Sequence, residues 1–202
     1  MATQNVVITA PNFEWAKFDI VGLAPLVMNK FSQKAREQMM KDQEAGHKKK
    51  KGEKKEPKDF NACYEGAIHR STDGWIGMPC AAFRNAMISA CRLVGFKMTL
   101  TKLAVFIEPD GFDEDEGTPL IKIGGEPRKF ESYVRNVKGI DIRIRPQFLK
   151  WSARISVRFD ADTFSFDDIA NLMMRAGLQV GIGEGRPDSK MSAGQGWGLF
   201  SI

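Results

Sequence analysis

The most constraining feature of the sequence is a strict alternation of apolar and polar residues over positions 151–159. The apolar members of this run are Trp151, Ala153, Ile155, Val157 and Phe159. Because successive side chains of a β-strand point to opposite faces, this period of two predicts a strand with one buried face. A second alternating run covers positions 140–145, and the short connection between the two runs predicts that they pair as antiparallel strands.

Two other segments carry apolar residues at helical spacing, three and four positions apart. The clearer one follows Pro79, which suits the start of a helix, and it stops before Gly95. The other begins with the capping pair Ser165 and Asp168, and Gly177 is expected to end it. Both segments therefore predict amphipathic helices that pack against a sheet.

The remaining segments complete a mixed pattern of strands and helices. Strands are expected at positions 14–21, 99–108 and 199–202, a hairpin at 64–76, and a third helix at 26–43. This order predicts an α+β fold of the ferredoxin-like (RRM-like) kind, an antiparallel sheet with two packed helices, inserted loops and a C-terminal glycine-rich loop. A single domain over residues 1–202 accommodates these elements.

The composition is that of an ordinary globular chain, 43% hydrophobic and 27% charged, which excludes wholesale disorder. No apolar run reaches the roughly 20 residues that a membrane span needs, and the first residues lack a signal-peptide pattern. The three cysteines form no CxxC pair, as expected in a reducing compartment. We therefore expect a cytoplasmic protein that does not contact a membrane.

The net charge of +5 is concentrated in one stretch of the chain, because positions 46–58 hold seven lysines and two glutamates. Few apolar residues interrupt this stretch, so residues 46–59 are predicted to be a flexible lysine-rich insertion. Lysines in such a loop can add phosphate contacts, or they can simply keep the loop solvated. The candidate phosphate ligands here are Lys48, Lys49, Lys50 and Lys51.

A second basic segment covers positions 128–158, where nine basic residues face two acids. If the two alternating strands pair, Arg143, Arg145, Arg154 and Arg158 share one surface opposite the apolar face. Planar guanidinium groups suit phosphate oxygens, and nearby aromatic rings can stack on bases. The further candidates are the basic residues Arg128, Lys129 and Arg135 and the aromatic residues Phe130, Tyr133 and Phe148. The alternative is a solvated outer face.

The glycine-rich stretch GIGEGRPDSKMSAGQGWGLF near the C-terminus resembles no nucleotide-binding fingerprint, since the required strand and long helix do not surround it. Glycines can nevertheless let backbone N–H groups approach a phosphate closely. The candidate ligand-binding residues of this loop are Gly183, Gly185, Arg186 and Lys190. A tight crossover between helix and strand is the alternative.

His69 is the candidate catalytic residue. A single general base that titrates near neutral pH can drive attack of an RNA 2′-hydroxyl on phosphorus. The cysteines lack metal-ligand spacing and are expected to be buried free thiols, and the acids at 113–116 are expected to form a solvated tip. We expect no metal and no cofactor.

Two features of the sequence together are similar to those of a known family. One is the segment Gly22-Leu23-Ala24-Pro25-Leu26-Val27-Met28 after the first predicted strand, and the other is the glycine-rich loop with Arg186 before the last predicted strand. The chain resembles the RAMP superfamily of CRISPR-associated proteins, especially the backbone subunits that polymerise along guide RNA. The compact sequence would also suit a phage or prophage member, acting in the host cytoplasm. The resemblance implies a ferredoxin-like core with a thumb-like insertion within residues 108–138, at either 108–122 or 126–138.

The resemblance implies a non-enzymatic protein that binds the sugar-phosphate backbone of single-stranded RNA or DNA. Such a protein would assemble side by side as a homo-oligomer, with other subunits of a nucleoprotein complex as further partners. One alternative is a metal-independent endoribonuclease using His69, since the cleaving members of the superfamily use histidines. The other is a phage-encoded inhibitor or assembly factor that binds protein.

Overall fold

The structure is a computed structural model that describes residues 8–31, 33–44, 58–136, 139–189 and 194–202. The strands are β1 (Phe13–Gly22), β2 (Leu26–Val27), β3 (His69–Arg70), β4 (Ile76–Pro79), β5 (Val105–Glu108), β6 (Gly111–Phe112), β7 (Pro119–Lys122), β8 (Pro127–Asn136), β9 (Gly139–Phe148), β10 (Ser152–Asp160) and β11 (Phe200–Ser201). The helices are α1 (Gln33–Glu44), α2 (Phe60–Glu65), α3 (Cys80–Ala90), α4 (Met98–Ala104) and α5 (Phe166–Arg175). Within these ranges no helix is both long and apolar enough to cross a membrane.

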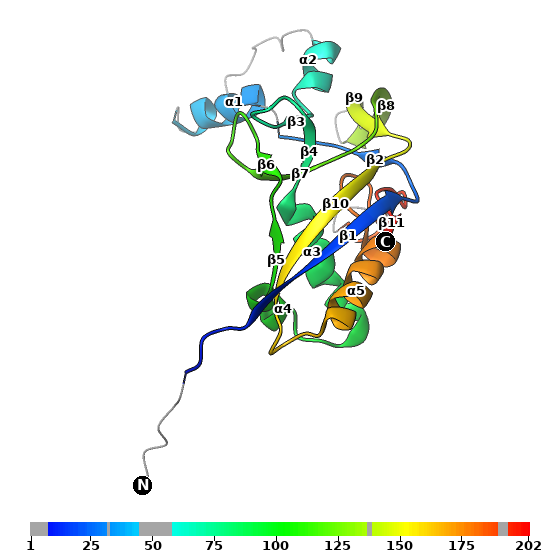
Figure 1. The fold of residues 1–202 in the computed structure, drawn as a ribbon. Helices are drawn as coiled ribbons and strands as arrows, with labels where there is room; N and C mark the ends of the chain where they lie inside the picture. Colours follow the sequence, from blue (N-terminus) through cyan, green and yellow to red (C-terminus); the bar gives the residue numbers. More distant parts are fainter. Residues whose placement is uncertain (1–7, 32, 45–57, 137–138, 190–193) are drawn as a thin grey trace.

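The chain forms an α+β fold built on antiparallel sheets. The central sheet has the strand order β11-β1-β10-β5, and every neighbouring pair in it is antiparallel. Helices α3 and α5 lie side by side behind this sheet in Figure 1 and cover one of its faces. The alternating run at 151–159 supplies β10, so the predicted strand with one buried face is confirmed.

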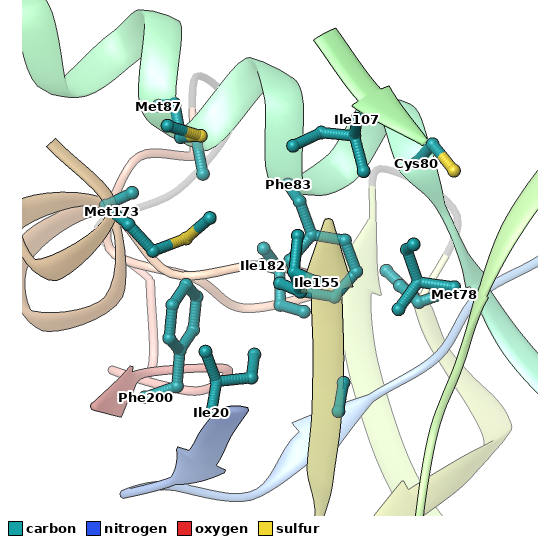
Figure 2. Packing of buried hydrophobic residues seen from close by; sticks show 14 of the residues in the cluster. Ile20, Met78, Cys80, Phe83, Met87, Ile107, Ile155, Met173, Ile182 and Phe200 are labelled. Atoms are coloured by element: carbon teal, nitrogen blue, oxygen red, sulfur yellow. The ribbon is translucent and has the colours of Figure 1, made fainter. Parts of the chain in front are cut away.

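The core lies between the central sheet and its two helices. Figure 2 shows Phe83 of α3 among side chains contributed by the sheet, by α5 and by the C-terminal segment. Phe83, Ile155 and Phe200 are fully buried, and Phe83 and Phe200 meet with ring centroids 6.3 Å apart. Removing such a ring costs about 3–5 kcal/mol, so this cluster fixes how the helices sit on the sheet.

Two smaller sheets extend the fold beyond the central one. The β8–β9 hairpin pairs along its whole length and joins β2 to form a three-stranded sheet. The other small sheet has the order β3-β4-β7-β6. The region 108–138 therefore divides between two structures: β6 and β7 belong to one small sheet, and β8 opens the hairpin of the other. The predicted flexible insertion at 46–59 lies almost wholly outside the described residues.

The predicted pairing of the two alternating strands is wrong, because β9 and β10 belong to different sheets. The chain turns a corner between them at Trp151, which is buried and donates its Nε1–H to the Ala24 carbonyl over 2.8 Å. Directly after the corner, Ser152 pairs with Val21 of β1. A contact with the distant first strand therefore overrides the local tendency to form a hairpin.

The predicted N-termini of helices α3 and α5 are confirmed, and the predicted C-terminus of α5 is wrong. The predicted capping box forms, since the Ser165 hydroxyl accepts from the Asp168 amide and the Asp168 carboxylate accepts from the Ser165 amide. Pro79 precedes α3, as predicted. Gly177 does not end α5, because the helix continues as a π-helical turn, Ala176–Val180, and Gly181 follows with φ 72°.

Three other predicted elements change type. Leu26 and Val27 form strand β2 rather than a helix, because they pair with Phe148 and Gln147 of β9, and α1 begins later. The first two residues of the predicted hairpin, Tyr64 and Glu65, belong to helix α2, whose N-terminus Asp59 caps. The Asp73-Gly74 turn and the strands β3 and β4 do form. The first half of the predicted strand at 99–108 is helix α4.

Candidate functional site

The four arginines predicted to share one surface lie in two sheets. Arg143 and Arg145 are on β9, whereas Arg154 and Arg158 are on β10. Since β9 and β10 do not pair, the single row of guanidinium groups does not form.

Each of these arginines also has an acidic neighbour. Arg154 pairs with Asp19 at 2.7 Å, Arg158 with Glu108 at 2.7 Å, Arg145 with Glu184 at 2.9 Å, and Arg143 lies 3.9 Å from Asp141. Three of the four acids come from outside the basic segment, so counting charges within that segment overestimated its positive potential. The hydrogen bond from Arg154 lowers the pKa of Asp19, although both side chains are exposed.

Two further basic residues that were predicted to bind phosphate, Arg128 and Lys129, make contacts at the base of the β8–β9 hairpin. Arg128 donates two hydrogen bonds to Gln147 on β9, at 3.0 and 2.8 Å. Lys129 bonds Asn61 of α2 and lies 5.5 Å above the Tyr64 ring. The backbone of Arg135 pairs on β8, but its side chain lies outside the described residues, as do Lys48, Lys49, Lys50, Lys51 and Lys190.

The aromatic candidates have three different environments. Phe148 is fully buried, so the prediction that it is a stacking platform is wrong. Phe130 packs edge-on against Trp197 of the glycine-rich loop, with ring centroids 5.4 Å apart. Tyr133 is 79% exposed on the hairpin. Phe130 therefore links the hairpin to the loop, and Tyr133 faces solvent.

The glycine-rich loop packs so closely on the rest of the chain that its glycines are required. Gly183 and Gly185 adopt φ of 77° and 75°, a left-handed conformation that side chains disfavour. A Cβ at Gly183 would lie 2.6 Å from the Val27 carbonyl oxygen, and one at Gly185 would lie 2.5 Å from the Trp197 ring. The loop is thus a tight crossover that also positions Arg186.

A cleft of about 410 Å³ separates this loop from helix α3, and we call it the glycine-loop cleft. The loop side includes Gly183, Glu184, Gly185, Arg186, Asp188 and Ser189, and the opposite side includes Asn29, His69, Asn85 and Ser89. The lining therefore combines amides, hydroxyls, an imidazole and charges in one concave site. Such convergence of polar groups in a cleft is typical of a ligand-binding site.

Among the described residues, the cleft lining carries three charged side chains, the carboxylates of Glu184 and Asp188 and the guanidinium of Arg186. The lining acid Glu184 pairs with Arg145, and the lining acid Asp188 pairs with Arg92. Burial raises the pKa of Asp188, but hydrogen bonds from Arg92 and Ser89 outweigh it, so the pKa is lowered and the carboxylate stays ionised. Arg186 donates to the Gly183 carbonyl at 3.0 Å and forms no salt bridge within the described part of the chain. Arg186 also lowers the pKa of Asp188 through space, so the two charges lie near one another without a direct ion pair.

His69 reaches the cleft from β3 and is held there by a buried carboxylate. Its Nδ1 lies 3.1 Å from Oδ2 of Asp113, and Oδ1 of the same residue accepts from Lys30 at 2.8 Å. Asp113 is 2% exposed, so the prediction of a solvated acidic tip is wrong at this residue. Two backbone N–H groups, of Asp115 and Glu116, complete its hydrogen bonding.

These contacts determine the protonation state of His69. Burial lowers the pKa of His69, and the hydrogen bond to Asp113 opposes that shift only in part. For Asp113, burial raises the pKa, but the bonds from Lys30 and His69 outweigh it and keep the carboxylate ionised. Since a carboxylate can only accept, the neutral imidazole donates from Nδ1 and leaves Nε2 as an acceptor.

Sequence reasoning identified Arg186, Gly183, Gly185 and His69 separately, and the structure brings all four to the glycine-loop cleft. It missed Asp113 and Lys30, since nothing local distinguishes a buried acid from its exposed neighbours. Among the described residues, no group of three or more His, Cys, Asp or Glu side chains could hold a metal ion. Burial raises the pKa of the Cys80 thiol to about 11, which makes it unreactive.

The fold is thus an α+β fold, and its glycine-rich crossover borders a polar cleft that includes the guanidinium of Arg186. The chain matches no known family model and no curated protein.

Proposed function

We propose that the protein binds a single strand of RNA or DNA through its sugar-phosphate backbone in the glycine-loop cleft. The observation that carries this proposal is the state of Arg186: it lines the cleft and has no salt bridge among the described residues, while both lining acids pair with other arginines. A guanidinium held in this way suits a phosphate oxygen, and the amides of Asn29 and Asn85 suit base edges or sugar hydroxyls.

We also propose a ferredoxin-like core of the RAMP kind. The order β11-β1-β10-β5, with α3 between β1 and β5 and α5 between β10 and β11 along the chain, supports this assignment. The β8–β9 hairpin is then the thumb-like insertion, and it extends to Phe148 rather than ending at residue 138. Side-by-side assembly on the strand, as in the backbone subunits that the sequence resembles, is part of the same proposal.

Fluorescence anisotropy with labelled single-stranded homopolymers of RNA and DNA tests the binding proposal. Affinity should fall as salt rises, because each phosphate contact releases counterions from the strand. Duplex at the same phosphate concentration should bind less well, because base pairing occupies the base edges that Asn29 and Asn85 would contact. A salt-independent signal, or no binding to any strand, contradicts the proposal and favours a protein-binding role.

A second candidate function is metal-independent RNA cleavage, and the contact of the cleft-lining His69 with the buried Asp113 favours it. Neutral His69 would accept the 2′-hydroxyl proton at Nε2, the 2′-oxygen would bond to phosphorus, and the 5′-oxygen would leave and take a proton from water. The products would be a 2′,3′-cyclic phosphate and a 5′-hydroxyl. Cleavage in EDTA that disappears in His69→Ala supports this function, and intact RNA with the wild-type protein excludes it.

A further inference from the structure

The two walls of the glycine-loop cleft carry very small side chains. Ala82 and Ala86 line it from helix α3, and Gly183 and Gly185 line it from the loop. None of these four residues extends beyond a methyl group, so each wall offers a surface on which a flat ring can lie. The volume of the cleft, about 410 Å³, falls within the range of roughly 300–1,000 Å³ that is usual for small-molecule sites. The shape of the cleft therefore suits a planar group such as a nucleobase.

Three groups that line the cleft can only accept hydrogen bonds. Two are the carboxylates of Glu184 and Asp188. The third is Nε2 of the neutral His69, because Nδ1 carries the ring proton and donates it to Asp113. Arg145 bonds to Oε2 of Glu184, but a carboxylate has several further acceptor sites. A ligand in the cleft therefore meets acceptors that need an N–H or O–H donor.

The donors of the cleft come from the loop and from α3. Arg186 directly follows Gly185 in the loop, and its guanidinium suits a phosphate oxygen. The side-chain amide of Asn85, on α3, can donate to a ring nitrogen. A nucleotide combines the matching groups in one ligand, because its base can lie against the small-residue walls while its phosphate meets Arg186.

We propose that the cleft binds one base of the strand, and that His69 selects bases with an exocyclic amino group, adenine and cytosine, over uracil and thymine. The amino group donates to Nε2, and the neighbouring ring nitrogen of the base accepts from the Asn85 amide. Uracil and thymine place a carbonyl oxygen where the amino group would be, so two acceptors would face each other. The inference rests on the proposed strand binding, with Nε2 holding a base rather than removing a proton from a 2′-hydroxyl.

The experiment compares single-stranded oligodeoxycytidine with oligodeoxyuridine of the same length. The two bases have the same ring size, and they differ in the amino group or carbonyl at C4 and in the acceptor or donor at N3. DNA lacks the 2′-hydroxyl, so the strands cannot be cleaved by attack of that group. Fluorescence anisotropy at neutral pH and fixed salt should give a dissociation constant about five- to tenfold lower for the deoxycytidine strand.

His69→Asn is the test variant, because its amide can still donate to Asp113 but leaves no acceptor in the position of Nε2. This variant should bind the two strands with nearly equal affinity. Arg186→Gln is the matched control: it should weaken binding of both strands by a similar factor and keep the preference for deoxycytidine. Circular dichroism checks that both variants are folded. A variant that only loosened the cleft would weaken both strands, so the ratio of the two dissociation constants separates base selection from stability.

The wild-type comparison decides the inference without depending on any variant. Equal affinities for the two strands, or tighter binding of oligodeoxyuridine, overturn base selection and leave strand binding standing. Absence of binding to either strand removes the proposed function, and base selection falls with it. A folded His69→Asn variant that keeps the full wild-type preference overturns the role of His69.

Discussion

Nδ1 of His69 lies 3.1 Å from Oδ2 of Asp113, and both residues are buried beside the glycine-loop cleft. The same carboxylate binds Lys30, so a buried cation and a neutral imidazole share one acceptor. This arrangement joins three separate parts of the chain: the segment after β2, the start of β3 and the turn after β6. It also fixes which ring nitrogen of His69 is available to a ligand.

Replacing Asp113 should destabilise the protein strongly. In Asp113→Ala, the buried Lys30 loses its buried acidic partner and keeps the partly exposed Asp115, and breaking a buried pair from one side costs about 3–5 kcal/mol. Urea denaturation measures this loss of unfolding free energy. Asp115→Ala is the matched control: it removes a partly exposed partner of the same lysine, and it should cost less than about 1 kcal/mol. Equal losses would show that Asp113 has no special role.

Stability should depend on pH through His69. Burial lowers the pKa of His69 below its ordinary value of 6.5, so the unfolded chain binds the proton more tightly than the folded protein does. The free energy of unfolding should therefore fall as the pH drops below 6.5, down to the pKa of the folded state. The lowered pKa of Asp113 adds a separate loss below its ordinary value of 3.8.

The matched variant for this pH dependence is His69→Asn, which cannot titrate but can still donate to Asp113. Urea denaturation between about pH 7 and pH 5 should show a smaller decrease for the variant than for wild type. An unchanged decrease would mean that other groups cause the pH dependence.

Two glycines of the same loop should respond differently to substitution. Gly183 and Gly196 both have positive φ, 77° and 71°, but only Gly183 has backbone within reach of an added Cβ. Gly196→Ala should cost about 1 kcal/mol from backbone strain alone. Gly183→Ala adds a clash with the Val27 carbonyl, so it should cost more and weaken strand binding by displacing Arg186. Thermal unfolding and anisotropy measure the two effects, and equal behaviour of the variants would contradict this reading of the loop.

Features determined by neighbours in sequence were predictable, and those determined by distant contacts were not. The capping box at Ser165 and the alternation in β10 depend on residues a few positions apart, and both were found. The corner at Trp151 depends on a hydrogen bond to Ala24, 127 residues away, so the wrong strand pairing was predicted. Arg154 likewise pairs with Asp19, which lies 135 residues away in the sequence, so a count of charges within the basic segment did not include this acid.

The candidate site shows the same division. Its glycines and Arg186 stand out in sequence, because a dense run of glycines is unusual and restricts the backbone locally. The link from His69 to Asp113 spans 44 residues and gave no local signal. The dense run of glycines therefore predicted the glycine-rich loop. Which residues line the other side of the glycine-loop cleft could be seen only in the folded structure.

The most direct test of strand binding in the cleft compares Arg186→Gln with Lys17→Gln. Each variant removes one positive charge, but Lys17 is exposed on β1 of the central sheet and does not line the cleft. Anisotropy against a single-stranded oligonucleotide at several salt concentrations gives the affinity and its salt slope. Arg186→Gln should weaken binding about tenfold and reduce the slope by about 0.7, whereas Lys17→Gln should match wild type. Equal affinities and slopes for Arg186→Gln and wild type would contradict the account.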